Sequence, residues 1–171
     1  DAYRTQLQQF VWHSGTFRKP IFAAAKSAHR GGGHTRVVYA EGEDERVLRA
    51  VQAVIDEGLA RPILVGRPAV IDRRIEKHGL RMRGGQDFDL VNPEFDPRYR
   101  EFWQAYHRLV ARKGVTEQYA RIEMRRRHTL IGSMLIHMGA ADGLICGTFG
   151  THRLHLHYID QVIGLRPGAT V

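Results

Sequence analysis

The sequence predicts an α/β fold, a three-layer lobe in which a mostly parallel sheet lies between helices. Short apolar runs rich in β-formers alternate with amphipathic segments of helical period along most of the chain, and glycine or proline stands at most junctions. This alternation is typical of parallel βαβ units with right-handed crossovers. Strands are expected at Val37–Ala40, Ile63–Val65, Leu90–Val91 and Leu144–Cys146.

The first two helices of the lobe follow the first two strands. Glu41-Gly42 forms a turn, after which apolar residues recur at helical spacing from Val47 to Ile55 and Gly58 suits the position just past the helix end. A second helix follows Gly66, with Pro68 in its first turn, and ends near Gly79.

The second half of the chain is mostly helical. Asp96 is expected to cap a helix whose first residue is Pro97, and Gly114 ends it. Thr116 caps a helix that runs to about Arg127. One apolar stripe on the first of these helices is expected in the core, and it contains Tyr99, Phe102, Trp103, Tyr106 and Leu109. Two more helices are expected over Leu130–Met138 and Thr151–Ile163, the latter after a buried-looking strand at Leu144–Cys146.

Three parts are expected along the chain. Residues 1–33 form a linker with N-terminal helices at Tyr3–His13 and Phe17–Ala28, joined to the rest by Gly31–Gly33. Residues 34–165 form the α/β lobe. Residues 166–171 lead into a second lobe outside this chain.

Composition bounds the class of protein. The 171 residues are 43% hydrophobic and 26% charged, close to ordinary globular values. The single cysteine, Cys146, cannot form an intramolecular disulfide, and no apolar run is long enough to span a bilayer. We therefore expect a cytoplasmic protein with no membrane partner.

A net charge of +8 attracts anions, which include nucleic acid, acidic lipid and phosphorylated metabolites. The basic residues are scattered, and the one triple, Arg125–Arg127, is read as a solvated helix end. Nucleic-acid binding would need basic residues on one face together with stacking aromatics, and it is not expected.

The segment Gly147-Thr148-Phe149-Gly150-Thr151 is the candidate ligand site. It lies between a strand and a helix, where glycines expose backbone N–H groups, the helix N-terminus is partly positive, and Thr148 and Thr151 add hydroxyl donors. It matches neither a Walker loop nor a dinucleotide fingerprint. An anion site and a plain capped turn both remain open.

Other chemistries receive little support. Of His152, His155 and His157, the last points away from the first two on a helix, so no metal site is expected. No nucleophile elbow or cysteine pair is present. We expect no catalytic residues in this chain.

Three segments resemble phosphate acetyl/butyryltransferases. They are Val38–Ala50, which is similar to the opening strand and helix of that family, Arg112–Thr116, and Ala141–Gly147. Leu7–Gly15, Glu123–Arg127, Cys146–Thr151 and Tyr158–Gly164 resemble, more closely, the C-terminal part of bacterial hybrid malic enzymes.

The resemblance implies the first lobe of a two-lobed, phosphotransacetylase-like module. It also implies an N-terminal malic domain, outside this chain, that uses NADP and Mg²⁺ or Mn²⁺ to decarboxylate malate oxidatively to pyruvate. The module itself would sense acetyl-CoA and form a homo-oligomer, at least a dimer. Candidate acyl-CoA or phosphate contacts are Lys113, Gly147, Thr148, Gly150, Thr151 and His157.

The sequence departs from the family at two arginine positions. Val110 and His157 stand where the transferases usually carry arginines that meet phosphate or CoA oxygens, with Arg108 and Arg112 flanking the first. These departures favour a regulatory module without acyl-transfer activity. The alternatives are an active phosphate acyltransferase and a purely structural dimerisation lobe.

Overall fold

The computed structural model describes residues 15–16, 18–27 and 34–169. The predicted helix at Tyr3–His13 and the glycine joint at Gly31–Gly33 lie outside the described residues. Within the described part of the next predicted helix, residues 18–27 are helical.

Four parallel strands form the sheet, in the order β3-β2-β1-β4. Their bounds are β1 Arg36–Tyr39, β2 Arg61–Val65, β3 Asp89–Val91 and β4 Gly143–Ile145. The predicted α/β class with its parallel sheet is confirmed.

Six α-helices follow in the described lobe. They are α2 Glu45–Asp56, α3 Pro68–Lys77, α4 Tyr99–Val110, α5 Glu117–Arg126, α6 His128–His137 and α7 His152–Val162, with a short 3-10 turn at Ala111–Lys113. Local signals explain several starts. Thr116 accepts a backbone N–H group of α5 as predicted, and Pro68 opens α3. Thr151, which was expected to begin the last helix, caps α7 instead.

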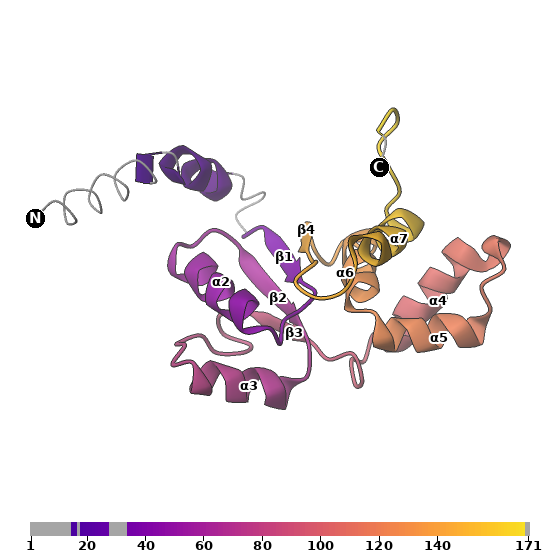
Figure 1. Cartoon of the computed structure of the whole chain (residues 1–171), viewed down its shortest axis with the longest axis horizontal. Coiled ribbons are helices and arrows are strands. Elements are labelled where there is room, and N and C mark those ends of the chain that lie inside the picture. The colour runs from indigo at the N-terminus through magenta and orange to yellow at the C-terminus, as the bar shows by residue number, and fades with distance from the viewer. Residues whose placement is uncertain (1–14, 17, 28–33, 170–171) are drawn as a thin grey trace, which may run out of the picture.

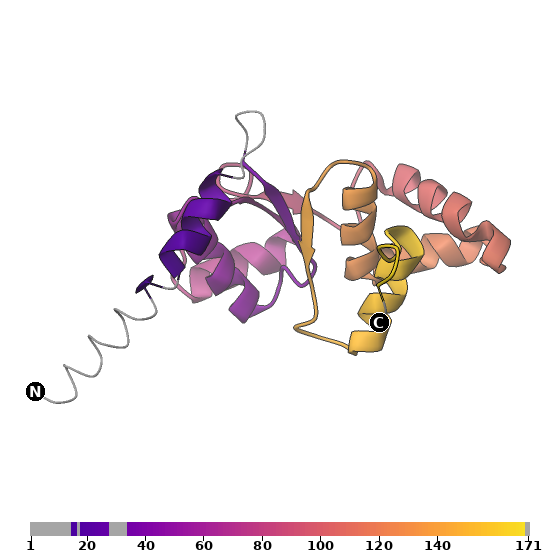
Figure 2. The same cartoon turned by 90° about the horizontal axis from the view of Figure 1, so that it is seen from above.

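The lobe has three layers (Figures 1 and 2). Helices α2 and α3 cover one face of the sheet, and α6 covers the other, with α4, α5 and α7 gathered beyond it. Alternate strand residues serve the two faces, since successive side chains of a strand point in opposite directions. Val38 packs in the cluster with α4–α7, whereas Tyr39 packs in the cluster with α2 and α3.

Two glycines permit close approaches, one between α6 and the sheet and one within the sheet. A Cβ atom on Gly132 of α6 would lie 2.5 Å from Leu144 Cδ1 on β4, so α6 lies directly on the sheet. A Cβ atom on Gly42 would lie 2.8 Å from the carbonyl oxygen of Val65, to which the Gly42 N–H donates at 3.1 Å. The turn after β1 is thereby fastened to the end of β2.

Three predicted details are wrong. Helix α4 begins at Tyr99, two residues after Pro97, because Asp96 accepts the N–H and the guanidinium of Arg98 in a turn of its own. Leu109 is 38% exposed, and Val110 takes the core position instead. The last strand ends at Ile145 rather than Cys146, and Ile145 is 53% exposed because β4 is an edge strand.

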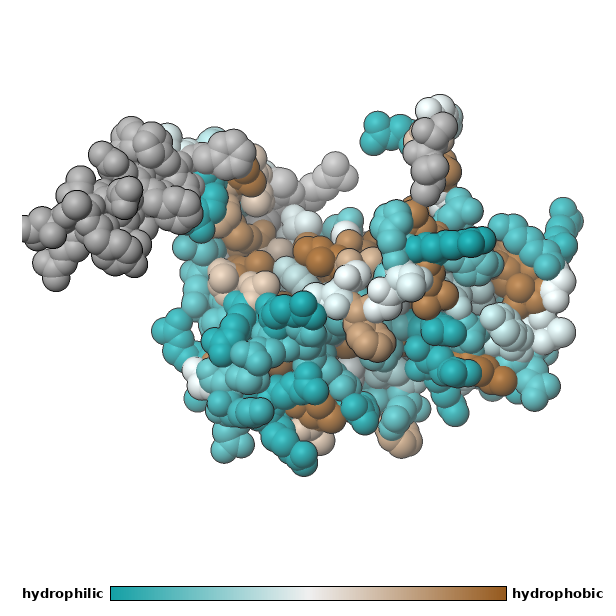
Figure 3. All heavy atoms as spheres, in the orientation of Figure 1, coloured by the Kyte–Doolittle hydropathy of each residue, from teal (hydrophilic) through white to brown (hydrophobic). Residues whose placement is uncertain are grey.

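One face of the molecule is mainly polar. On the face drawn in Figure 3, hydrophilic residues predominate and hydrophobic ones form small separate patches. None of the helices in the described part of the chain is long and apolar enough to cross a membrane.

Candidate functional site

Parallel strands bring their carboxyl ends to one edge of a sheet, where open α/β folds normally bind ligands. Here β1 runs into Glu41 and β4 runs into Gly147, with the C-terminal end of α5 and the start of α7 beside them. A cavity of about 230 Å³ lies at this edge, and we call it the sheet-edge pocket. It is lined by Glu41, Arg126, Arg127, His128, Thr129, Phe149, Gly150, Leu154, His155 and Tyr158.

The glycine-rich turn at the pocket holds an internal carboxylate. Gly147 N–H donates to Glu41 Oε1 at 3.1 Å, and the Thr148 hydroxyl donates to Glu41 Oε2 at 3.1 Å. The Arg46 guanidinium donates to the Thr148 carbonyl oxygen at 3.2 Å. The Gly147 N–H and the Thr148 hydroxyl are donors that the sequence predicted for a bound anion. In the structure they bind the carboxylate of Glu41.

Thr151, in contrast, serves the helix that follows it. Its hydroxyl oxygen accepts the Leu154 N–H at 3.4 Å as the N-cap of α7. Gly147 and Gly150 adopt φ values of 111° and 100°, which side chains rarely tolerate, so both glycines are needed for the shape of the turn.

His155 bridges the floor of the pocket to the turn. Its Nε2 lies 2.8 Å from the Phe149 carbonyl oxygen and its Nδ1 lies 2.7 Å from the Thr129 hydroxyl oxygen. A carbonyl oxygen only accepts, so Nε2 carries the proton, and in the neutral ring Nδ1 accepts from Thr129. Both nitrogens are therefore engaged, and His155 holds the turn in place rather than presenting a base to a ligand.

The opposite wall contains a buried polar cluster. Glu123 is only 3% exposed and accepts hydrogen bonds from the Tyr158 hydroxyl and, at 3.1 Å, from Arg127 Nε. Burial and the neighbouring Glu123 carboxylate raise the pKa of Tyr158, so the phenol stays protonated. Arg127 is consequently held at the pocket wall with part of its guanidinium outside the cluster.

Two further titratable groups near the pocket are held neutral. Burial lowers the pKa of His128, whose Nδ1 donates to the Ala40 carbonyl oxygen at 3.1 Å. Burial also raises the pKa of the Cys146 thiol, so Cys146 is not an activated nucleophile. Metal binding gains no support either, since the described residues contain no group of three or more His, Cys, Asp or Glu side chains that could hold an ion.

The structure brings together only some of the predicted contact residues. Gly150 lines the pocket, and Gly147 and Thr148 donate to Glu41, which also lines it. Lys113 lies before the N-terminal end of α5, so the ten-residue helix separates it by about 15 Å from the α5 end that lines the pocket. His157 is exposed on α7, with its ring edge-on to Tyr158 at 5.2 Å, and it does not line the pocket.

Sequence reasoning missed most of the pocket wall. The lining residues lie in parts of the chain that only the fold brings together, among them Glu41, Thr129, His155 and Tyr158. Glu41 alone had a usable signal, because it directly follows the predicted strand Val37–Ala40 and so lies at the carboxyl edge of a parallel sheet.

Position 110, where the family usually carries an arginine, is part of the core. Val110 has no exposed surface and packs in the core. The Val110 side chain therefore does not reach the surface, whereas its neighbours in sequence Arg108 and Arg112 are exposed.

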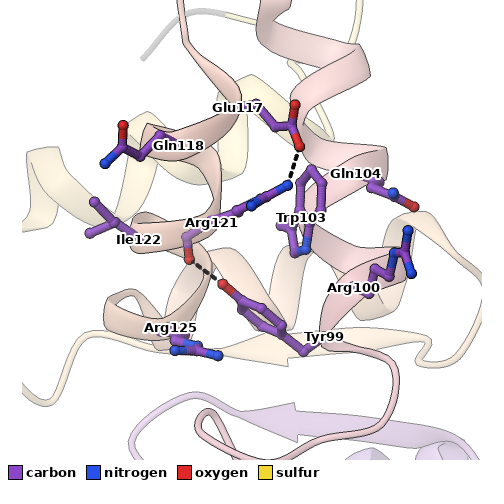
Figure 4. A pocket seen from close by; sticks show the side chains of 9 residues that line it. All are labelled: Tyr99, Arg100, Trp103, Gln104, Glu117, Gln118, Arg121, Ile122 and Arg125. Carbon is purple, nitrogen blue, oxygen red and sulfur yellow. Dashed lines mark hydrogen bonds and ion pairs between the residues drawn. The ribbon is translucent and has the colours of Figure 1, made fainter.

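A second hollow lies between α4 and α5 (Figure 4). Its volume is about 640 Å³, and we call it the α4–α5 groove. The Arg121 guanidinium lies 4.3 Å from the Trp103 ring centre and pairs with Glu117, and Arg125 lies 4.5 Å from the ring centre of Tyr99. The groove is open and cationic, and besides this stacking the Tyr99 hydroxyl donates to the Arg121 carbonyl oxygen at 2.7 Å.

Comparison with known proteins places the chain in context. The family profile described as phosphate acetyl/butaryl transferase matches residues 16–171. A phosphotransacetylase from Streptococcus pyogenes superposes with a TM-score of 0.74 at 28% identity, over 90% of this chain and 45% of that one.

Two malic enzymes are more similar in sequence. The chain is 49% identical to the NAD-dependent malic enzyme of Rhizobium meliloti and 44% identical to the NADP-dependent malic enzyme of Salmonella typhimurium, over 168 residues in each case. Those residues are 98% of this chain but only 21% and 22% of the two relatives. The chain thus spans about a fifth of the malic enzymes that it matches.

Proposed function

Because the chain belongs to the phosphate acetyl/butaryl transferase family, we propose that it is the regulatory, acetyl-CoA-sensing and oligomerising domain of a malic enzyme. The protein that contains it would be a cytoplasmic enzyme that decarboxylates malate oxidatively to pyruvate. Its dinucleotide and its Mg²⁺ or Mn²⁺ would bind outside this chain. The sequence favoured NADP, whereas the two relatives are named for different dinucleotides, so the choice depends on the malic domain.

One observation carries the proposal that the domain binds a ligand without catalysing acyl transfer. In the sheet-edge pocket, the candidate reactive groups are engaged with one another: Glu41 with the turn, and both nitrogens of His155 with Thr129 and the Phe149 carbonyl. Binding needs only a hollow with cations near it, and Arg126 and Arg127 supply these. Acyl transfer also needs preorganised donors aimed at the charge that develops in the transition state.

The test has two arms, both on the full-length protein. Calorimetry is expected to detect acetyl-CoA binding, and a coupled assay is expected to detect no acetyl-CoA formation from acetyl phosphate and CoA. Since one missing transition-state donor costs about a hundred- to a thousand-fold in rate, the absence of arginine at positions 110 and 157 is expected to leave little activity. Robust formation of acetyl-CoA would contradict this proposal and favour an active transferase. Absence of acetyl-CoA binding would favour a purely structural dimerisation lobe.

Regulation requires that acetyl-CoA bind one state of the enzyme better than another, because equal affinity shifts no equilibrium. Malate oxidation is therefore expected to change with acetyl-CoA concentration, and sedimentation is expected to show an oligomer of at least two subunits. A monomer at high concentration would contradict the oligomerising role and leave ligand binding to be judged by calorimetry.

A further inference from the structure

We infer that Glu41 is an internal competitor for the anion site: its carboxylate occupies the position that an oxyanion of a bound ligand takes, and the ligand must displace it. The ligand class is a phosphate or diphosphate group, either free or carried by a coenzyme. The inference rests on the proposed function for the coenzyme as the source of that group, while the competition itself rests on the geometry of the turn.

Each carboxylate oxygen of Glu41 has one donor of its own. Gly147 N–H meets Oε1 and the Thr148 hydroxyl meets Oε2, both at 3.1 Å, so the turn recognises two oxygens of one anion. A backbone amide and a neighbouring hydroxyl at a glycine turn are the donors that phosphate groups use in proteins. The chain therefore satisfies with its own carboxylate a receptor of the kind that fits phosphate.

Glu41 differs from the acidic residues that follow it. Glu43 pairs with Arg67, Asp44 with Arg46, and Glu45 with Arg49, at 2.9–3.0 Å. Among the residues that the structure describes, no lysine, arginine or histidine forms an ion pair with Glu41. Its carboxylate is held at the turn by two hydrogen bonds, so a ligand that replaces them displaces it without breaking an ion pair.

The receptor does not depend on Glu41 for its shape. The Arg46 guanidinium holds the Thr148 carbonyl at 3.2 Å, and His155 Nε2–H holds the Phe149 carbonyl at 2.8 Å. Thr151 fixes the far end of the turn as the α7 cap. When the carboxylate leaves, these three contacts keep the Gly147 N–H and the Thr148 hydroxyl in place, and the freed donors face an anion at no further cost in ordering the loop.

The decisive variant is Glu41→Gln in the full-length protein. Glutamine keeps the shape and removes the charge, so inorganic phosphate is expected to bind about tenfold more tightly by calorimetry, since hydrogen bonds to a charged acceptor are the stronger ones. Glu45→Gln is the matched control, because it changes net charge equally from an exposed site and is expected to keep wild-type affinity. Adding Thr148→Val to Glu41→Gln is expected to reverse the gain and so locate the ligand at this turn.

A local readout covers the case in which Glu41→Gln alters stability. Hydrogen exchange of the Gly147 amide is expected to be faster in Glu41→Ala than in the wild type, because that N–H loses its acceptor, and to slow again when phosphate is added. Thermal unfolding of both variants establishes that they are folded. Unchanged phosphate affinity in both Glu41 variants would overturn the inference, and so would a gain that Thr148→Val leaves intact.

Further arms separate this inference from the proposed function. Acetyl-CoA, which carries phosphates, is expected to gain affinity in Glu41→Gln, whereas acetyl-pantetheine, which carries none, is not. If Glu41→Gln binds inorganic phosphate more tightly but the protein does not bind acetyl-CoA, Glu41 is a competitor and the domain is not an acetyl-CoA sensor. If acetyl-CoA binds with the same affinity to the wild type and to Glu41→Gln, the domain is a sensor and Glu41 is not a competitor.

Discussion

The two hollows of this domain hold their arginines in opposite situations. At the sheet-edge pocket, Arg127 donates to a buried carboxylate, and the surrounding polar groups pair with one another across segments distant in sequence. In the α4–α5 groove, Arg121 and Arg125 lie on aromatic rings of the adjacent helix, and Arg100 has no ion-pair partner among the described residues. The difference is that the smaller hollow has oriented donors and acceptors, which specific binding needs, whereas the larger and more cationic one is lined by stacked and, within the described part of the chain, unpaired arginines.

The largest expected effect concerns two glutamates of α5. Glu123→Ala is expected to destabilise the domain by about 3 kcal/mol, because it leaves the buried Tyr158 hydroxyl and the Arg127 guanidinium without their acceptor. Glu117→Ala breaks an exposed pair with Arg121 at the groove and is expected to cost less than about 1 kcal/mol. Urea denaturation measures both, and equal costs would erase the contrast between the two hollows.

The next prediction tests whether His155 holds the glycine turn through both of its ring nitrogens. Thr129→Val is expected to cost about 1–2 kcal/mol, since Nδ1 of the imidazole loses its hydrogen-bond donor in a buried setting. Nitrogen NMR of the imidazole is expected to show the Nε2–H tautomer in the wild type. A wild-type ring protonated on Nδ1 would contradict the assigned hydrogen-bond direction, and Thr129→Ser, which keeps the hydroxyl, serves as control.

A smaller effect is expected in the groove. Arg121→Ala removes a stacked guanidinium and an exposed ion pair, so it is expected to cost about 0.5–1 kcal/mol and to change the near-ultraviolet dichroism of the tryptophans. Arg121→Lys keeps the charge and gives up the planar stacking. If the lysine variant behaves as wild type in both measurements, stacking on Trp103 contributes nothing to the groove.

The last prediction is confined to acid. Hydrogen bonding to Arg67 lowers the pKa of Glu43 from 4.5 to about 2, and Glu43 lies just after the strand that leads to the pocket. A depressed folded-state pKa gives stability that is present above about pH 4.5 and is lost as pH falls toward 2. Glu43→Gln is expected to flatten the unfolding free energy across that window while leaving the pH dependence unchanged above it, and an unaltered acid limb would contradict the pairing with Arg67.

Local chemistry made much of the fold readable in advance. The predicted features act within a few residues: the alternation of strands and helices, the cap at Thr116, the proline that opens α3 and the glycine past the end of α2. Predictions from local patterns were wrong where a contact outside the pattern decided the structure. Asp96 binds Arg98 instead of capping a helix at Pro97, and Leu109 loses its place in the core to Val110.

For the candidate site, the sequence by itself determined a glycine turn with oxyanion donors at the end of a strand. Only the tertiary structure decided what those donors hold. Glu41 and Gly147 are 106 residues apart and meet because β1 and β4 are neighbours in the sheet, a pairing that no local pattern specifies. Lys113 and His157, which the resemblance placed with the turn, are kept away from it by the length of α5 and the direction of α7. The physical reason is that local propensity acts over a few residues along the chain, whereas an anion site is closed by side chains that the sheet order brings together.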